Sequence, residues 1–270
     1  KLLKAERPDH MVVCYDRKEP SFRKELYQDY KAHRTEMPDD LVAQIPYMKK
    51  MVEVLGIPAL EATGFEADDI IGTLTRLGVE NKMEVVIVSG DKDFAQLIRP
   101  GVIMYDTMKD LKLDEKGVLE KWGVHPEQFQ DYLAIVGDSS DNIPGVAGLG
   151  PKGAQKLLND YNSLEGIYKN LDTVKPLGTQ EKLRASKEMA FLSQKLVCIE
   201  QNVPVDKNME SYRMKGLKRE ELSVFLRDLN FKTFERSLLG EELNAPVAPV
   251  AVEDNSEISA LVEKQRAVLS

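Results

Sequence analysis

Acidic residues gather at four places in this sequence, each at the end of an expected strand or the start of an expected helix. Asp16 follows the apolar run His10–Tyr15, and Asp91 and Asp93 follow the apolar run Val85–Ser89. The remaining acids are Glu66, Asp68 and Asp69 in GFEADDIIGTL, and Asp138 and Asp141 in a glycine-flanked turn. Each group alone has an ordinary explanation, such as acids that complement a helix dipole. Four groups at one edge of a parallel sheet do not share that explanation.

The chemistry that such a cluster favours is metal-assisted hydrolysis. Many carboxylates in one place repel one another unless cations neutralise them. A ligand set of carboxylates and water, without Cys or His, favours Mg²⁺ or Mn²⁺. Two such ions about 3.5–4 Å apart are suited to in-line attack on a phosphodiester. The sequence therefore predicts a site for two divalent metal ions.

A glycine-punctuated segment follows the last acids. A glycine turn that opens a helix offers backbone N–H groups to a phosphate, and lysines on that helix add positive charge. The alternative is an acidic surface turn followed by an ordinary glycine-capped helical hairpin. The residues that would contact a DNA backbone here are Gly145, Gly148, Gly150, Lys152 and Lys156.

A second basic segment lies near the N-terminus. The range Arg17–Arg34 has six bases and three acids and carries a net charge of +3. Helical spacing would place Phe22, Leu26 and Tyr30 on one face, with Arg23, Tyr27, Lys31 and Arg34 beside them. Bases interleaved with aromatic rings suit a surface that grips phosphates and stacks on nucleobases, with Phe22 and Tyr30 as the stacking candidates. A solvated amphipathic helix is the alternative.

Strands and helices alternate in the first half of the chain and helices dominate the second. The strands are expected at His10–Tyr15, Ile57–Ala62, Val85–Ser89 and Val102–Tyr105. Apolar spacing predicts one long helix from Pro38 to Leu55, kinked at Pro46 and ended by Gly56. Further helices are expected at 66–77, 114–122, 126–136, 163–169, 180–201 and 218–230. This pattern predicts an α/β domain with a parallel sheet, followed by a mostly helical part.

Composition limits the class of protein. The chain has 270 residues, of which 42% are hydrophobic and 30% charged, which suits one large or two modest domains. Cys14 and Cys198 lie in apolar runs and are expected to be reduced core residues. No apolar run reaches membrane-spanning length.

The net charge of −8 argues against a nucleic-acid partner, but residues 241–270 carry half of it. In that tail, Asn244–Ser256 is expected to be a linker, and the last residues a short helix or the start of a further domain.

Taken together, these motifs resemble a known family. FEADDIIGTL, VSGDKDFAQL and GDSSDNIPGVAGLGPKGAQKLL resemble the 5′-nuclease domain of bacterial DNA polymerase I, within the flap-endonuclease family, and the likeness covers about residues 1 to 235. The resemblance implies a PIN-like, Rossmann-like parallel sheet with a helical arch, then a helical subdomain that contains a helix–three-turn–helix. It implies a catalytic domain over residues 1–136, a DNA-binding subdomain over 137–240 and a linker over 241–270 toward a polymerase region.

The resemblance also implies roles for individual residues. The eight acids named above would hold two Mg²⁺ or Mn²⁺ ions. Lys31 and Arg34, in the segment that resembles the arch, would act on the scissile phosphate, and Arg23 would contact the 5′ strand. The hairpin residues would hold duplex DNA, with a K⁺ ion bound by backbone carbonyls.

The implied activity is that of a structure-specific 5′-3′ exonuclease and flap endonuclease. Its substrates would be 5′ flaps and nicked or gapped duplex DNA, and it would act as a monomer fused to a polymerase domain in the bacterial cytoplasm, at the nucleoid. The family has a first strand with its own metal-binding Asp, and this chain lacks that strand. We therefore expect an unpaired flank beside His10–Tyr15, and the alternative function is that of a non-catalytic DNA-binding fragment. A small-molecule phosphohydrolase is a further alternative, but it would need neither the basic segment nor the glycine hairpin.

Overall fold

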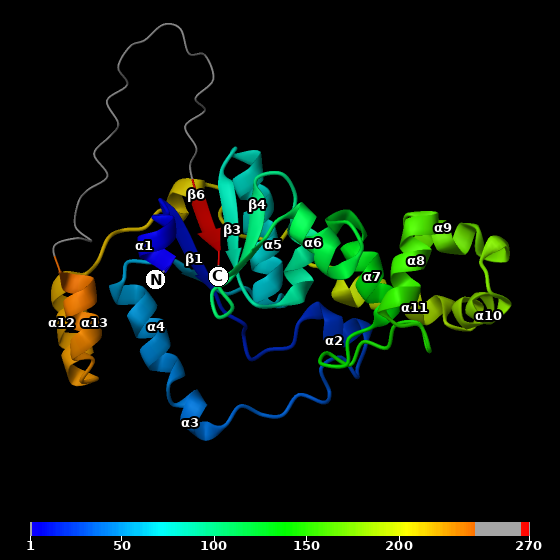
Figure 1. Cartoon of the computed structure of the whole chain (residues 1–270). Helices are drawn as coiled ribbons and strands as arrows, with labels where there is room; N and C mark the ends of the chain where they lie inside the picture. The colour runs from blue at the N-terminus through cyan, green and yellow to red at the C-terminus, as the bar shows by residue number, and fades with distance from the viewer. Residues whose placement is uncertain (1, 241–265, 270) are drawn as a thin grey trace, which may run out of the picture.

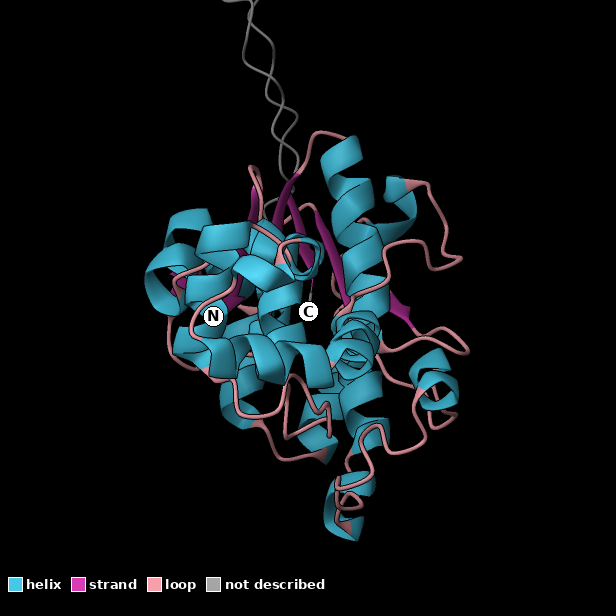
Figure 2. Ribbon diagram, turned by 90° about the vertical axis from the view of Figure 1, so that its right-hand side faces the viewer, coloured by secondary structure: helices cyan, strands magenta, loops and turns pink. Residues whose placement is uncertain are grey.

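The computed structural model describes residues 2–240 and 266–269. In this part of the chain, a six-stranded sheet lies between layers of helices (Figure 1 and Figure 2). Its strands are β1 His10–Cys14, β2 Ala59–Leu60, β3 Glu84–Val88, β4 Val102–Asp106, β5 Leu111–Leu113 and β6 Arg266–Leu269. The strand order is β2-β1-β6-β3-β4-β5, with every neighbouring pair parallel except β4 and β5. The predicted α/β class with a parallel sheet is confirmed.

Both faces of the sheet are buried, as the continuous apolar runs predicted. Val85 and Ile87 of β3 point into the main core, and Val86 between them points into a second cluster on the opposite face. The helix α5 Ala67–Glu80 packs on the main core, while α1 Leu2–Glu6 and α4 Ile45–Val54 contribute to the second cluster. The sheet is therefore a rigid base for the loops at the carboxyl ends of its strands.

The expected unpaired flank beside β1 is not found. β1 pairs with β2 on one side and with β6 on the other, and Met11 lies opposite Val268. β6 also pairs with β3, so residues 266–269 form a strand and the prediction of a helix at these positions is wrong. The predicted linker Asn244–Ser256 lies outside the described residues.

The basic segment is less helical than its apolar spacing predicted. Only α2 Phe22–Leu26 is helical, and Tyr27 then adopts an extended conformation with φ −148° and ψ 107°. Turns follow because Tyr30 is buried and the Lys31 N–H donates to the Asp141 carbonyl at 2.9 Å. Figure 1 shows the chain between α2 and α3 Asp39–Val42 as an open arch below the sheet.

The long helix predicted from Pro38 to Leu55 is two helices, α3 and α4. Pro46 lies in the first turn of α4, where its missing N–H is tolerated, so it starts a second helix instead of kinking one. Gly56 ends this region with φ +70°. A Cβ at this position would lie 2.0 Å from the Gly216 carbonyl oxygen, so the close backbone approach requires glycine.

The second half is mostly helical, as predicted. The helices from α6 onward are α6 Glu115–Trp122, α7 Phe129–Val136, α8 Pro151–Tyr161, α9 Leu164–Lys169, α10 Leu177–Ala185, α11 Lys187–Val197, α12 Arg219–Asp228 and α13 Lys232–Leu239. The 3-10 turns of the described chain are η1 Lys92–Leu97, between β3 and β4, η2 Pro126–Gln128, η3 Leu171–Thr173 and η4 Met209–Tyr212. The predicted helix 180–201 is broken at Ser186, and α13 and β5 were not predicted. Within the described residues, no helix combines the length and the apolar character that crossing a membrane requires.

Candidate metal centre and DNA interface

The acids at the carboxyl ends of β1 and β3 meet the start of α5. An Asp16 carboxylate oxygen accepts a hydrogen bond from the Ala67 N–H at 2.8 Å, which ties the end of β1 to the first turn of α5. Asp91 caps η1, where its side chain accepts from the Asp93 N–H at 3.0 Å. Sequence-distant acids are thus held by short backbone contacts at one edge of the sheet.

Two carboxylates of this group, Asp68 and Asp93, have raised pKa values. Burial raises the pKa of Asp68 to about 7, and the nearby carboxylates of Asp91 and Asp16 add to the rise. Burial and Asp91 likewise raise the pKa of Asp93 to about 6. One oxygen of Asp93 is buried without a hydrogen-bond partner. Crowded acids with an unsatisfied oxygen fit a hard cation better than they fit a purely structural role.

Asp138 lies in the turn after α7 and faces η1. Its carboxylate accepts from the Ser140 N–H at 2.7 Å and from the Lys92 ammonium at 2.5 Å. Burial alone would raise the pKa of Asp138, but Lys92 and Ser140 hold it below its ordinary value. The same ammonium lies 3.2 Å from an oxygen of Asp93. Lys92 was not among the residues that the sequence singled out, although its place between two predicted ligands in GDKDF was a usable signal.

Two of the remaining acids face bases of the arch segment. The Lys31 ammonium donates to Glu66 at 2.9 Å, and the Arg34 guanidinium donates to Asp141 at 2.7 Å. Burial disfavours a charged Glu66, but Lys31 and Arg23 hold its pKa below the usual value. The structure therefore brings Lys31 and Arg34 to the predicted acids.

Asp69 and Arg23 form a buried pair beneath Glu66, and Arg23 also lies 3.6 Å from the Glu66 carboxylate. Asp69 is fully buried, and its two oxygens accept from the Arg23 guanidinium at 2.7 and 2.8 Å. The backbone N–H groups of Glu66 and Glu200 also donate to Asp69. Arg23 is 3% exposed and donates further to the Leu196 and Cys198 carbonyls at the end of α11. Because every polar atom of the pair is used inside the fold, the structure argues against Asp69 as a metal ligand and against Arg23 as a DNA contact.

Three other predicted DNA contacts are occupied within the protein. Tyr30 is 5% exposed and its hydroxyl donates to Glu66 at 3.1 Å, so its ring is not free to stack on a base. Phe22 is half-buried and packs edge-on against Phe65. Gly145 is buried and its N–H donates to the Ser193 hydroxyl at 3.1 Å. A Cβ at Gly145 would lie 2.5 Å from the Gly137 nitrogen, so packing explains this glycine without a phosphate.

The start of α8 does present an open basic surface. Gly150 caps the helix, and Lys152 and Lys156 are exposed one turn apart. Gly148 is exposed with φ +73°, and its carbonyl accepts from the Lys182 ammonium at 2.9 Å. Phosphate binding by this hairpin stays a prediction, and Lys182 on α10 is a basic residue of this surface that sequence spacing did not indicate.

The carboxylates have not closed into a coordination sphere. Among the described residues, no group of three or more His, Cys, Asp or Glu side chains has the spacing that would hold a metal ion. Three of the acids are instead ion-paired with basic side chains, those of Lys31, Arg34 and Lys92. The donor set fits divalent ions in its chemistry, and its side chains would have to rearrange to bind them.

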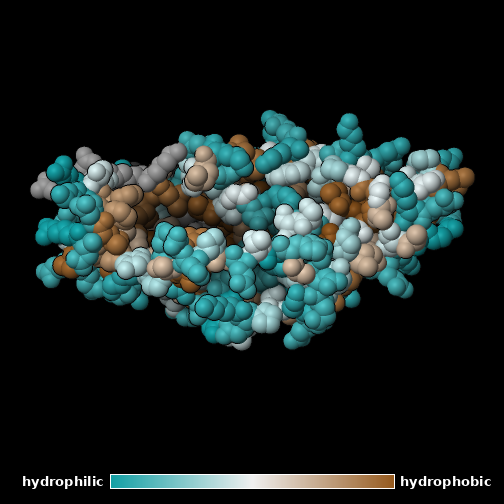
Figure 3. Space-filling view, turned by 90° about the horizontal axis from the view of Figure 1, so that it is seen from below, coloured by the Kyte–Doolittle hydropathy of each residue, from teal (hydrophilic) through white to brown (hydrophobic). Residues whose placement is uncertain are grey.

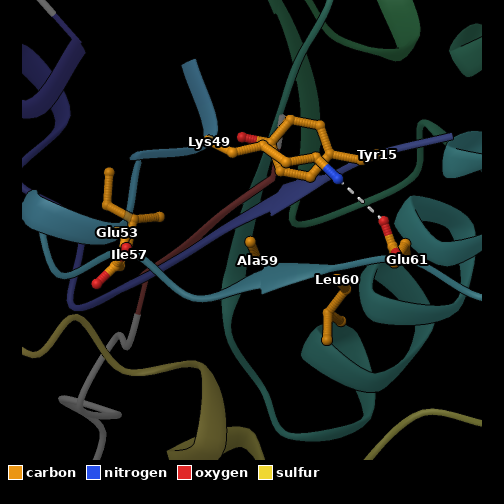
Figure 4. Close-up of a pocket in the computed structure, with 7 residues that line it drawn as sticks. All are labelled: Tyr15, Lys49, Glu53, Ile57, Ala59, Leu60 and Glu61. Atoms are coloured by element: carbon orange, nitrogen blue, oxygen red, sulfur yellow. Dashed lines mark hydrogen bonds and ion pairs between the residues drawn. The ribbon is translucent and has the colours of Figure 1, made fainter. Parts of the chain in front are cut away.

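A separate open hollow of about 330 Å³ lies between α4 and the edge strand β2 (Figure 4). Lys49 spans it, ion-paired to Glu61 at 3.2 Å and over the Tyr15 ring at 5.0 Å. None of the eight predicted acids lines it. Seen from below, the molecule is hollowed with hydrophobic atoms visible inside polar rims (Figure 3). We assign the chemistry to the acidic edge because the hollow lacks its crowded carboxylates.

The raised pKa of Asp68 predicts a pH-dependent stability. Between the ordinary Asp pKa and about 7, folded Asp68 keeps a proton that the unfolded chain has lost, so the free energy of unfolding falls as pH rises through this window. Asp68→Asn should therefore stabilise the metal-free protein by about 1–2 kcal/mol at pH 8 and have no such effect at pH 4. Thermal unfolding at both pH values measures this, with Asp160→Asn on the exposed side of α8 as the control. Equal stabilities of Asp68→Asn and the parent protein at pH 8 would show that the ionised Asp68 carboxylate does not destabilise the fold.

Two sequence models of one family cover most of the chain. The N-terminal resolvase-like domain of 5′-3′ exonuclease matches residues 1–123, and its C-terminal SAM fold matches residues 124–220. The DNA polymerase I of Caldicellulosiruptor bescii is 43% identical over 245 residues, covering 88% of this chain and 29% of that protein. The thermostable DNA polymerase I of Thermus filiformis is 40% identical over 270 residues, covering 98% of this chain and 32% of that protein. The chain therefore spans about three tenths of the length of these relatives.

Solved structures share the fold. The 5′-exonuclease of phage T5, solved with divalent zinc ions bound, has a TM-score of 0.65 at 24% identity and covers 88% of this chain and 86% of its own. The catalytic core of Rad2 in complex with a DNA substrate has a TM-score of 0.57 at 15% identity, over 84% of this chain and 76% of its own. The PIN-like sheet followed by a helical subdomain is thus the fold of known 5′ nucleases. With the two family models covering residues 1–220, the chain belongs to the 5′-3′ exonuclease family of hydrolytic nucleases.

Proposed function

We propose that this chain hydrolyses DNA phosphodiesters at 5′ ends and 5′ flaps, as the 5′ nuclease of a bacterial DNA polymerase I. The observation that carries the proposal is the meeting of acids and arch bases at one edge of the sheet. Burial and the carboxylates of Asp91 and Asp16 raise the pKa of Asp68 there, while Lys31 reaches Glu66 beside them. A phosphodiester at this edge would meet both a metal-binding surface and positive charge.

Seven of the eight predicted acids form the proposed ligand set for two divalent ions, Mg²⁺ or Mn²⁺. Asp69 is left out because Arg23 neutralises it in the core. When bound, the ions would supply Lewis-acid catalysis, which activates water for attack and stabilises the leaving 3′ oxygen. The ligand set is Asp16, Glu66, Asp68, Asp91, Asp93, Asp138 and Asp141.

Lys31 and Arg34 are proposed to stabilise charge on the scissile phosphate. Both reach the acids from the arch segment, and the side chain of Arg34 is 54% exposed, so it can turn toward a bound phosphate. Tyr30 holds this segment in place, because its buried hydroxyl donates to Glu66 and burial raises its pKa, so that it stays a neutral donor. Positioned cations aimed at developing charge are a strong source of rate enhancement.

The duplex is proposed to lie along the start of α8. Lys152 and Lys156 would contact phosphates, and the positive end of the α8 dipole would add to their attraction. A K⁺ ion is proposed at the carbonyls of the glycine turn, since the Gly148 carbonyl already accepts from a lysine ammonium. We further propose a catalytic domain over residues 1–136, a monomer joined to a polymerase domain, and action on nicked, gapped or flapped DNA in the bacterial cytoplasm, at the nucleoid.

The phosphate contacts give a salt-dependent prediction. Replacing both Lys152 and Lys156 by Ala should weaken binding of every duplex sequence alike and make the salt slope of log Kd shallower by about one unit per lost contact. Binding of two unrelated duplexes between low and moderate salt measures this. Lys116 and Lys207 are exposed outside α8, and replacing both by Ala is the charge-matched control. An unchanged slope would identify the two lysines as solvated helix residues.

A DNA-binding fragment without catalysis is the second candidate. It is favoured by the open arrangement of the acids, which do not form a metal site among the described residues. The complete gene product should be mixed with a 5′-flapped duplex, with Mg²⁺ or with a chelator. Cleavage that requires Mg²⁺ supports the nuclease, whereas tight binding with no cleavage under either condition supports the second candidate.

A further inference from the structure

One lysine of the acidic edge has a role that the nuclease proposal leaves unassigned. The Lys92 ammonium lies 2.5 Å from Asp138 and 3.2 Å from Asp93, and thus bridges η1 and the turn after α7. The Asp93 oxygen that lies 3.2 Å from this ammonium is buried and has no hydrogen-bond partner. One positive charge therefore stands between two proposed metal ligands and fully satisfies only Asp138.

An ammonium and a divalent ion cannot share this position. Oxygen ligands lie about 2.0–2.1 Å from Mg²⁺, so an ion held by Asp93 and Asp138 would need the space beside the lysine nitrogen. The two cations would also repel each other across a short distance. The Lys92 side chain is 42% exposed and has a flexible stem, so it can leave toward solvent.

We propose that Lys92 is a positioning residue that holds Asp93 and Asp138 together in the metal-free protein and is displaced by the incoming divalent ion. The inference rests on the proposed function, because it takes these two acids as metal ligands. Without Lys92, the two carboxylates would repel each other and the turn after α7 would lose its tie to η1. Once displaced, the ammonium is free to meet a DNA phosphate at the same edge.

Removing the positive charge of Lys92 tests whether its ammonium competes with Mg²⁺ for the two carboxylates. In Lys92→Met the stem keeps a similar length, and the ion no longer competes with an ammonium. Mg²⁺ should bind this variant about tenfold more tightly, since displacing a partly buried ion pair no longer opposes binding. The metal-free variant should unfold at a lower temperature than the parent protein. Lys116→Met is the matched control, because Lys116 is 81% exposed on α6 and pairs only loosely with Glu120 at 3.6 Å.

The movement of Lys92 itself is tested by chemical labelling. Calorimetry gives the Mg²⁺ affinity of the complete gene product, and an amine-reactive ester followed by peptide mass spectrometry gives the labelling rate of each lysine. Mg²⁺ should accelerate labelling of Lys92 and leave Lys116 unchanged. Labelling of Lys92 that does not respond to bound Mg²⁺, or equal or weaker Mg²⁺ binding by Lys92→Met, would overturn the inference and leave the nuclease proposal standing. Absence of Mg²⁺ binding by the parent protein would overturn both.

Discussion

Asp91→Asn is expected to slow cleavage of a 5′-flapped duplex by on the order of 10³-fold, because it removes a charged ligand from the centre of the proposed metal site. Asp91 is suited to this test because the fold should tolerate the change. Its side chain caps η1 by accepting the Asp93 N–H, and Asn is an equally good cap. Single-turnover cleavage in the complete gene product measures the effect on the chemical step.

The affinity for DNA is the companion measurement for Asp91→Asn. Binding of the flapped duplex should survive, since the proposed phosphate contacts Lys152 and Lys156 lie on α8 and not at the acidic edge. Asp172→Asn, on an exposed side chain ion-paired to Arg184, is the control and should cleave at the parent rate. A cleavage rate for Asp91→Asn within a few-fold of the parent would refute the metal-site assignment.

Arg23→Leu is expected to destabilise the fold by about 3–5 kcal/mol, because it leaves the fully buried Asp69 without its cation. The same change removes the ties from α2 to the carbonyls of Leu196 and Cys198. Urea or thermal unfolding measures the loss. Arg34→Leu is the matched control, since Arg34 pairs with Asp141 while 54% exposed and should cost less than about 1 kcal/mol.

A double variant distinguishes a core role of Arg23 from a role in DNA binding. Arg23→Leu combined with Asp69→Asn should be more stable than the sum of the two single losses predicts, because the pair acts as a unit. If Arg23→Leu instead kept the parent stability and weakened DNA binding, the sequence-based assignment of Arg23 to the DNA interface would be right and the structural one wrong.

The sequence predicted the sheet because its strands carry a strong local signal. Runs such as Val85–Ser89 are apolar throughout, and only a strand buried on both faces explains that pattern. The positions of Asp16, Asp91 and Asp138 at element ends then followed from topology. The length and register of the short strands could not be predicted in this way. β2 has only two residues, and β5 is a short antiparallel edge strand whose position is set by tertiary contacts.

Burial decided the cases that sequence reasoning missed. Arg23 and Tyr30 were assigned to a DNA surface because bases and aromatic rings alternate there, yet both are buried, Arg23 against Asp69 of α5 and Tyr30 against Glu66, the N-cap of that helix. Asp69 belongs to the same acidic run as Asp68, and only the fold distinguishes them. Asp69 is paired with Arg23 in the core, whereas burial and nearby carboxylates raise the pKa of Asp68. Periodicity cannot report which polar residue finds a buried partner, because the partner lies far away in the sequence.

The dependence of the single-turnover cleavage rate on Mg²⁺ concentration tests the central claim, that the acidic edge is a divalent-metal centre for phosphodiester hydrolysis. The complete gene product and a 5′-flapped duplex should show no cleavage in chelator and a rise steeper than first order in Mg²⁺ before saturation, as two ions require. Asp91→Asn should flatten this rise. Cleavage that persists in chelator, or a rate independent of Mg²⁺, would contradict the account.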